Sequence, residues 1–115
     1  MTIIRHDPGA RFCRAVVHNG TVYLAGFVAE DTAQGTEGQT RDILAQIDAA
    51  LAKAGTSKAR LLTASVWLRD IADFAQMNAA WDAWIDRDNM PVRATVEARL
   101  AGPEYRVEIQ VTAAL

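Results

Sequence analysis

The sequence predicts an α+β fold, a two-layer sandwich in which two helices cover one face of a mixed, mostly antiparallel sheet. Two segments carry apolar residues at helical spacing, and the segments around them alternate between apolar and polar residues as strands do. Their order is strand-strand-helix-strand-helix-strand-strand. A chain of 115 residues, half of them apolar, has the size and composition of one domain with one core, so residues 1–115 are interpreted as a single domain.

The N-terminal part predicts a β-hairpin. Alternating segments at about 12–18 and 21–28 flank Asn19-Gly20, which is the strongest short signal for a hairpin turn. A short first strand near 2–5 has a weaker pattern. Residues 30–38 are polar and rich in glycine, and they predict a loop before the first helix.

The first helix is predicted to begin at Thr36, with Gln39 completing a capping box three residues later. Gly55 is expected to end it as a left-handed C-cap. The apolar positions between these ends recur at helical spacing, which predicts a helix packed on the core. They are Ile43, Leu44, Ile47, Ala50, Leu51 and Ala54.

The next alternating segment, 60–69, predicts a mostly buried strand. One side carries Leu62, Ala64, Val66 and Leu68, and the other carries Thr63, Ser65 and Trp67. Asp70 and Asp73 then favour a helix start through capping and through their charge at the positive end of the dipole. The apolar face of this helix consists of Phe74, Met77, Trp81, Trp84 and Ile85.

Asn89 and Pro91 are expected to end the second helix, because proline disfavours helix at the residue before it. Two final strands, at about 94–100 and 105–113, are joined by a Gly-Pro turn. The sheet face away from the helices is predicted to carry Val17, Tyr23, Thr63, Ser65, Trp67 and residues around Val96. Bulky apolar groups there predict burial against a partner subunit.

Composition excludes several classes of function. The net charge is −2, which gives no electrostatic reason to expect nucleic acid. The single Cys13 forms no internal disulfide, and we interpret it as a small core or interface residue rather than a nucleophile. Glycine-rich phosphate loops and zinc spacings are absent, and His6 and His18 lie in different segments, so no metal and no cofactor is expected. No apolar run suggests a membrane span or a signal peptide, and a soluble cytoplasmic protein is expected.

Arg93 and Glu108 are the candidates for chemistry. Arg93 follows Pro91 at a helix-to-strand junction, and a guanidinium binds a planar carboxylate bidentately. Glu108 lies midway along the last strand, and a carboxylate can move protons to and from water. Together they suit a small acid that carries a hydrolysable group. The alternative for Arg93 is an ordinary surface arginine, and the alternative for Glu108 is one member of a solvated strand face.

The segment Pro91-Val-Arg93-Ala-Thr-Val96-Glu, with Glu108 fifteen positions after Arg93, resembles the C-terminal signature of the reactive-intermediate deaminases (Rid, also called YjgF-like). Three upstream segments resemble the family's early strand, central strand and second helix, in the right order: Val22-Tyr-Leu-Ala-Gly26, Val66-Trp-Leu-Arg-Asp70, and Asp73-Phe-Ala-Gln-Met-Asn78 followed by Trp81. The resemblance implies the fold of the small trimeric chorismate mutases. It also implies a homotrimer with ligand sites in the clefts between subunits.

The resemblance further implies that Arg93 binds the substrate carboxylate and that Glu108 positions or activates the hydrolytic water. Backbone groups near Gly26 and Thr95 are expected to orient the substrate. The family's best-studied deaminases have a tyrosine at Phe12, Ser-Gly-Gln at Ala25-Gly26-Phe27, and often a cysteine at Thr95. These departures predict a more apolar pocket. Arg14 is either a second cation of the site or an ordinary strand-edge arginine.

The function implied by this resemblance is hydrolysis of reactive 2-imino or enamine acids to 2-keto acids and ammonia. The alternative is a non-catalytic module of the same fold that binds a small carboxylate or apolar metabolite, which the loss of the two hydroxyls at Phe12 and Ala25 favours somewhat. RNA cleavage has been attached to relatives, but an acidic chain without a basic stripe makes it the least expected reading.

Overall fold

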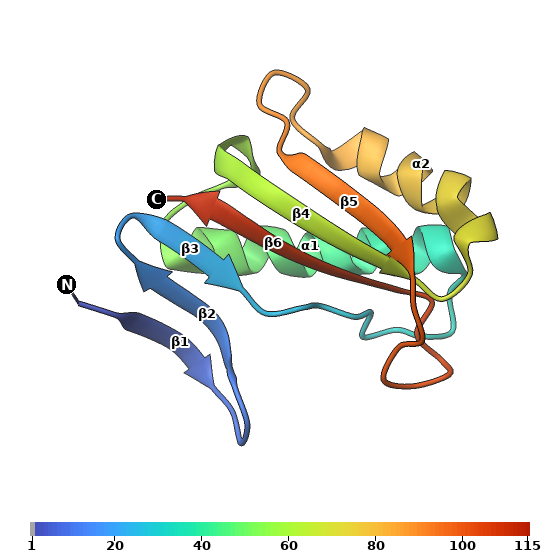
Figure 1. Cartoon of the computed structure of the whole chain (residues 1–115), viewed down its shortest axis with the longest axis horizontal. Coiled ribbons are helices and arrows are strands. Elements are labelled where there is room, and N and C mark those ends of the chain that lie inside the picture. Colours follow the sequence, from blue (N-terminus) through green and yellow to red (C-terminus); the bar gives the residue numbers. More distant parts are fainter. Residues whose placement is uncertain (1) are drawn as a thin grey trace.

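A computed structural model describes residues 2–115 as a six-stranded sheet with two helices packed on one of its faces (Figure 1). The strands are β1 (Ile4–Pro8), β2 (Cys13–His18), β3 (Thr21–Leu24), β4 (Leu61–Leu68), β5 (Val92–Glu97) and β6 (Val107–Ala114). The helices are α1 (Thr36–Ala54) and α2 (Phe74–Trp84), with short 3-10 turns at Lys58–Arg60 and Ile71–Asp73. The predicted α+β class, with both helices on one face, is confirmed.

The strands lie in the order β1-β2-β3-β6-β4-β5, and all neighbours are antiparallel except β4 and β5. A parallel pair needs a crossover connection, and α2 provides it. The Gly-Pro turn therefore joins two strands that are not neighbours, because β4 lies between β5 and β6. This arrangement determines how far apart the candidate site residues lie.

The Asn19-Gly20 hairpin is confirmed. Both residues have positive φ, 52° and 75°, as a type I′ turn requires. Its second strand, predicted to reach residue 28, ends at Leu24. The chain leaves the ladder at Ala25 and Gly26, and Phe27 then pairs with Ile109 on β6 through hydrogen bonds of 2.8 and 3.1 Å. The weakly predicted first strand exists, shifted to Ile4–Pro8.

Helix α1 has the predicted extent, and Gly55 ends it with φ 93°. The predicted capping box is wrong. Gly35 is the N-cap, and the Thr36 hydroxyl donates to the Asp73 carboxylate at 2.7 Å, which ties α1 to the start of α2. The Gln39 side chain does not reach back to the cap, because it is engaged with two loops.

Gln39 is fully buried and makes four hydrogen bonds. Its Nε2 donates to the carbonyls of Gln34 at 3.1 Å, Glu104 at 3.1 Å and Thr32 at 3.4 Å, and its Oε1 accepts from the Arg106 amide at 3.0 Å. One side chain therefore joins the loop before α1 to the loop that leads into β6.

The predicted pattern of the central strand needs one correction. Two residues at its start oppose one residue of β6, so a bulge shifts the register between Leu61 and Thr63. Leu61 is buried in place of Leu62, which is 44% exposed. Beyond the bulge, Ala64, Val66 and Leu68 face the helices as predicted.

Helix α2 ends earlier than predicted. Asp70 caps the preceding turn by accepting from the Ala72 amide, as its position suggested. The helix stops at Trp84, because Ile85 is extended and Asp86 accepts hydrogen bonds from the Asp88 amide and the Asn89 side chain. The strand after Pro91 accordingly begins at Val92, and it ends at Glu97.

The open face of the sheet, which is viewed in Figure 1, differs from the prediction at one position. Val17 faces the helices and is buried, while Val16 lies beside Tyr23 in the register of β2 and β3. Tyr23, Val92 and Val96 are 47%, 71% and 50% exposed, so the open face carries uncovered apolar side chains. No helix among the described residues is long and apolar enough to cross a lipid bilayer.

Candidate functional site

Glu108 lies on the open face, because it pairs with Trp67 on β4 while its neighbours Val107 and Ile109 face the core. Its carboxylate lies directly over Gly26. A Cβ at Gly26 would meet Glu108 Oε2 at 2.2 Å and Cδ at 3.2 Å, so this approach requires a residue without a side chain. Burial raises the pKa of Glu108 above its usual range. A carboxylate in this state is a stronger base than one in water.

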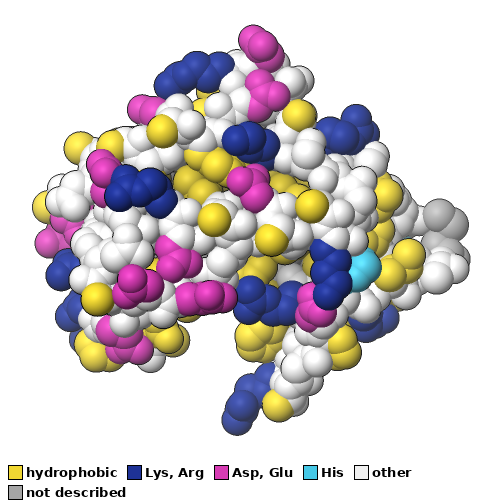
Figure 2. Space-filling model, turned by 180° about the vertical axis from the view of Figure 1, so that it is seen from behind, with side chains coloured by type: hydrophobic (Ala, Val, Ile, Leu, Met, Phe, Trp, Pro, Cys, Tyr) yellow, Lys and Arg dark blue, Asp and Glu magenta, His cyan; other side chains and the backbone are white. Residues whose placement is uncertain are grey.

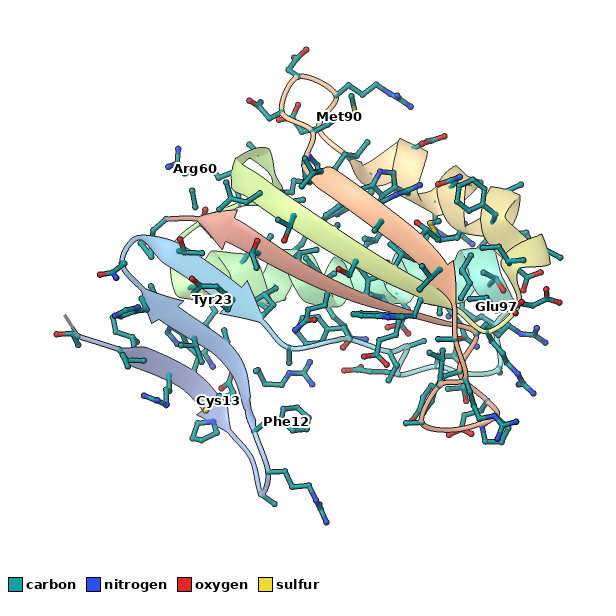
Figure 3. All side chains as sticks on the ribbon, in the orientation of Figure 1. Phe12, Cys13, Tyr23, Arg60, Met90 and Glu97 are labelled. Carbon is teal, nitrogen blue, oxygen red and sulfur yellow. The ribbon has the colours of Figure 1, made fainter. Side chains whose placement is uncertain are left out.

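A cavity of about 420 Å³ opens beside Glu108. It is walled mainly by the apolar residues Phe12, Cys13, Val16, Leu24 and Ala25, together with Tyr23 and Gln110. Figure 3 shows Phe12 and Cys13 at the start of β2 and Tyr23 on the neighbouring β3. Phe12 is 65% exposed, so its ring forms an open rim of the cavity. Glu108, Gly26 and Phe12 thus lie together in the folded chain.

Arg14 and Phe27 lie at a second cavity, of about 480 Å³, which shares Phe12 and Gly26 with the first. The Arg14 guanidinium lies 4.3 Å from the centroid of the Phe27 ring and donates to Gln46 Oε1 at 3.3 Å. The Phe27 ring is only 1% exposed and belongs to the core. At this second cavity Phe27 therefore supports Arg14 rather than offering an open surface.

Arg93 lies on the other face of the sheet. It pairs with Ala64, whose side chain is buried beneath the helices, so the Arg93 side chain points toward α2. Its guanidinium lies 5.0 Å from the Trp81 ring centroid and 5.9 Å from that of Phe74. Burial lowers the pKa of Arg93 and the nearby Asp82 raises it, but an arginine keeps its charge at neutral pH.

Thr95 shares the face of Arg93 on β5, which is the edge strand of the sheet. The Ala98 amide donates to Leu68 on β4, so alternate amides along β5 point inward, and those of Arg93 and Thr95 point to the free edge. The Thr95 hydroxyl oxygen is buried, and within residues 2–115 it has no hydrogen-bond partner. In the described part of the chain, the edge of β5 thus presents a cation and backbone donors that no strand pairs.

One chain does not bring Arg93 and Glu108 together. Their side chains lie on opposite faces of the sheet, with β4 between their strands. Arg93 is level with Val111 through Ala64, three residues from Glu108, which is roughly 10 Å along the strands and roughly 10 Å across them. The chain therefore carries two half-sites: the Glu108 half-site, with Gly26 and Phe12, and the Arg93 half-site, with Thr95.

Sequence reasoning did not find the two aromatic residues around Arg93. One signal could have found them: Phe74 and Trp81 are seven residues apart, and so lie on one face of the helix in the crossover connection from β4 to β5. Because a parallel crossover packs its helix against the strands that it joins, an aromatic face on α2 meets a helix-facing arginine on β5.

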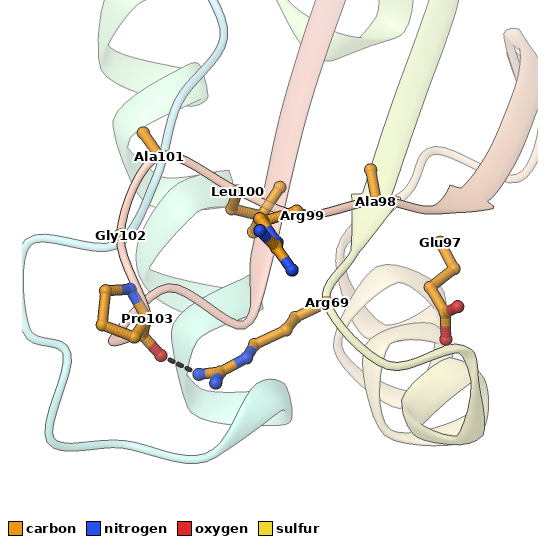
Figure 4. A pocket seen from close by; sticks show the side chains of 8 residues that line it. All are labelled: Arg69, Glu97, Ala98, Arg99, Leu100, Ala101, Gly102 and Pro103. Atoms are coloured by element: carbon orange, nitrogen blue, oxygen red, sulfur yellow. Dashed lines mark hydrogen bonds between the residues drawn. The ribbon is translucent and has the colours of Figure 1, made fainter.

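Another cavity, of about 680 Å³, lies elsewhere, between the ends of β4 and β5 and the loop that follows β5 (Figure 4). The Arg69 guanidinium extends across it and donates to the Pro103 carbonyl. Glu97 accepts a hydrogen bond from the Ile71 amide at 3.0 Å. None of the predicted site residues lines this cavity. The Arg69 contact ties the loop between β5 and β6 to the end of β4, and the Glu97 contact ties the end of β5 to the turn before α2. Within the described part of the chain, no cluster of three or more His, Cys, Asp or Glu side chains is arranged to hold a metal ion.

Comparison with known proteins identifies the family. The model of the family described as "Endoribonuclease L-PSP" matches residues 2–115. The chain is 48% identical over 115 residues to the RutC family protein YoaB of Escherichia coli (strain K12), covering both proteins completely. The chain belongs to the Rid family, whose members are also called YjgF-like.

Relatives of known structure agree with this assignment. NMB1025 of Neisseria meningitidis, a member of the YjgF protein family, superposes with a TM-score of 0.96 at 47% identity, covering 99% of this chain and 95% of that one. A conserved Rid family protein of Yersinia pestis, YyfA, superposes with a TM-score of 0.85 at 28% identity, over 92% and 89% of the two chains. The fold of this Rid chain is thus that of its family over almost its whole length.

Proposed function

We propose that the protein hydrolyses 2-imino acids, and their enamine tautomers, to 2-keto acids and ammonia in a cleft between the subunits of a homotrimer. The observation that carries the proposal is the separation of the two half-sites. Arg93 can anchor a carboxylate and Glu108 can handle protons, but they lie on opposite faces of one chain. A substrate that needs both groups can bind where the Arg93 half-site of one subunit faces the Glu108 half-site of its neighbour.

The exposed apolar side chains support an assembly of this kind. Phe12, Tyr23, Val92 and Val96 are each between 47% and 71% exposed, and they lie on or beside the open face of the sheet. Uncovered apolar groups on a sheet face are typical of surfaces that a partner buries. Within the sheet that residues 2–115 form, the free edge of β5 also leaves backbone donors unpaired next to Arg93. A neighbouring subunit that covers this region would enclose the substrate and exclude bulk water.

In the proposed reaction, the Arg93 guanidinium of one subunit binds the substrate carboxylate, and the Thr95 amide at the strand edge donates to the same group. Glu108 of the neighbour takes a proton from a water molecule as the water oxygen attacks C2 of the imine. The protonated Glu108 then donates this proton to the nitrogen. Glu108 next takes the proton of the new C2 hydroxyl as the carbonyl forms, and the nitrogen receives this second water proton as the C2–N bond breaks and ammonia leaves. One water is consumed for each imine, and no cofactor takes part.

The elevated pKa of Glu108 suits this role, because a general base is most effective when its pKa approaches the working pH. Imines already hydrolyse in water, so positioning and proton transfer need to supply only a modest acceleration. The expected substrate is a small carboxylate, and nucleic acid is not expected. On the helix-bearing side of the molecule, basic and acidic side chains are interspersed and form no continuous basic stripe (Figure 2).

The test follows the decay of imines that an amino-acid oxidase generates in situ, with catalase present. Wild-type protein is expected to accelerate the decay of 2-iminopropanoate and of a bulkier branched or aromatic imino acid, and Arg93→Ala is expected to abolish the effect. Full activity in Arg93→Ala refutes the assignment of the anchor. No acceleration with any imine, from a protein shown to be trimeric, favours the alternative function, a module that binds a small carboxylate without turnover. The mainly apolar pocket wall around Phe12 and Ala25 is the observation in favour of that alternative.

A further inference from the structure

Helix α2 surrounds the Arg93 guanidinium with three side chains. Phe74 and Trp81 are seven positions apart and lie on one face of the helix, with Met77 between them. The guanidinium carbon lies 5.0 Å from the Trp81 ring centroid and 5.9 Å from that of Phe74, and a guanidinium nitrogen lies 3.8 Å from Met77 Sδ. We call Phe74, Met77 and Trp81 the Arg93 clamp.

The clamp holds a cation that has no ion-pair partner. In residues 2–115, no carboxylate oxygen lies within 4 Å of the Arg93 guanidinium, whereas Arg41 pairs with Glu37 at 2.5 Å. A half-buried arginine that contacts two ring faces and a thioether keeps its charge. Among the described residues, its N–H groups have no oxygen acceptor. Such a group is suited to bind an external anion.

We propose that Phe74 and Trp81 are positioning residues that hold the Arg93 guanidinium against the edge of β5, where its N–H groups and the free Thr95 amide meet the substrate carboxylate. This inference rests on the proposed role of Arg93 as the carboxylate anchor. An unrestrained arginine loses the freedom of its long side chain when it binds a ligand, and packing against rings removes that freedom in advance. The clamp therefore acts on the affinity for the carboxylate rather than on the chemical step.

Three variants and a matched control test the clamp. Trp81→Leu and Phe74→Leu each remove one ring, and Trp81→Phe keeps a ring in place. The control is Trp84→Leu, one turn along the same helix. Trp84 lies 5.6 Å from Trp81 but contacts Lys58 and Asp48 rather than Arg93. Phe74 is 42% exposed, so Phe74→Leu keeps the test valid if Trp81→Leu does not fold.

Three quantities are measured for each trimeric variant: KM and kcat for 2-iminopropanoate, and the Kd of pyruvate, a 2-keto acid, by NMR titration. Loss of either ring is expected to raise both KM and Kd roughly three- to tenfold, with a smaller change in kcat. Trp81→Phe is expected to restore most of the affinity. Trp84→Leu is expected to lower thermal stability while KM and Kd stay within about twofold of wild type. Methyl pyruvate, which lacks the negative charge, is expected to bind all variants equally.

The outcomes separate the clamp from the proposed function. If the wild type turns over the imine but Phe74→Leu and Trp81→Leu leave KM and Kd unchanged, the clamp is overturned and the hydrolase stands. If the wild type shows no turnover but the ring variants weaken pyruvate binding, the clamp stands and the hydrolase falls. An equal loss of affinity for pyruvate and methyl pyruvate overturns the clamp, because general damage to the pocket explains it.

Discussion

Replacing Gly26 by alanine tests whether the position of the Glu108 carboxylate matters. The new Cβ would lie 2.2 Å from Oε2 and 3.2 Å from Cδ, whereas contacts closer than 3.0 Å are essentially never found for a real Cβ. The carboxylate must therefore move by about 1 Å or more. A displacement of this size costs on the order of a hundredfold in a reaction that depends on positioning. Because the displaced atoms end a flexible side chain, the free energy of unfolding is expected to change by less than about 1 kcal/mol.

The assay compares kcat/KM for imine hydrolysis with the midpoint of thermal unfolding, in Gly26→Ala and in the control Gly35→Ala. No atom lies within 4 Å of a Cβ at Gly35, and its φ of −75° suits alanine. We expect a large loss of activity in Gly26→Ala alone, with the fold retained in both. Wild-type activity in a folded Gly26→Ala protein would refute the reasoning that places Glu108 at the reacting centre.

Three further changes have defined outcomes. Gln39→Leu leaves three carbonyls and one amide without their buried partner. The free energy of unfolding, measured in urea at fixed protomer concentration, should fall by roughly 2–4 kcal/mol. A fall of less than about 0.5 kcal/mol contradicts this role of Gln39. Because the pKa of Glu108 is raised, the folded state holds the carboxyl proton more tightly than the unfolded state does. The free energy of unfolding should therefore fall as pH rises from the usual pKa of a glutamate through the raised pKa of the folded state. Glu108→Gln should remove this decline in stability, and it should also remove the rise of kcat/KM over the same pH range. If the variant keeps the wild-type dependence of stability on pH, the pKa of Glu108 is not raised. Thr95→Val removes a buried hydroxyl that has no hydrogen-bond partner among residues 2–115, so the free energy of unfolding should stay within about 1 kcal/mol of wild type or increase. A clear loss of stability indicates a partner from a neighbouring subunit.

Local patterns predicted much of the fold because local chemistry decides those features. Asn19-Gly20 and Gly55 adopt the left-handed conformations that their turns require, and helical spacing located the buried face of α1. The errors arose where distant contacts decide. The bulge that exposes Leu62 depends on the pairing of β4 with β6. The Gln39 side chain hydrogen-bonds to two loops, and local sequence patterns do not show that both loops lie near it.

The candidate site was predicted in parts. The residue types at Arg93 and Glu108, together with the family resemblance, indicated a carboxylate anchor and a proton-handling group. Alternation along two strands cannot show that β4 lies between them, because strand order is a property of non-local pairing. The opposite orientation of the two side chains came only from the structure, and it adds a geometric argument for the cleft between subunits that the family resemblance implied.

The most direct measurement of the central claim mixes two inactive variants. Arg93→Ala and Glu108→Gln are purified separately, unfolded and refolded together so that subunits exchange, and assayed for imine hydrolysis beside each variant refolded alone. If each site takes Arg93 from one subunit and Glu108 from another, mixing in equal amounts restores roughly a quarter of the wild-type sites, because both intact half-sites then meet at some interfaces. If the mixture stays as inactive as its components while co-refolded wild type regains activity, Arg93 and Glu108 do not form a site between subunits.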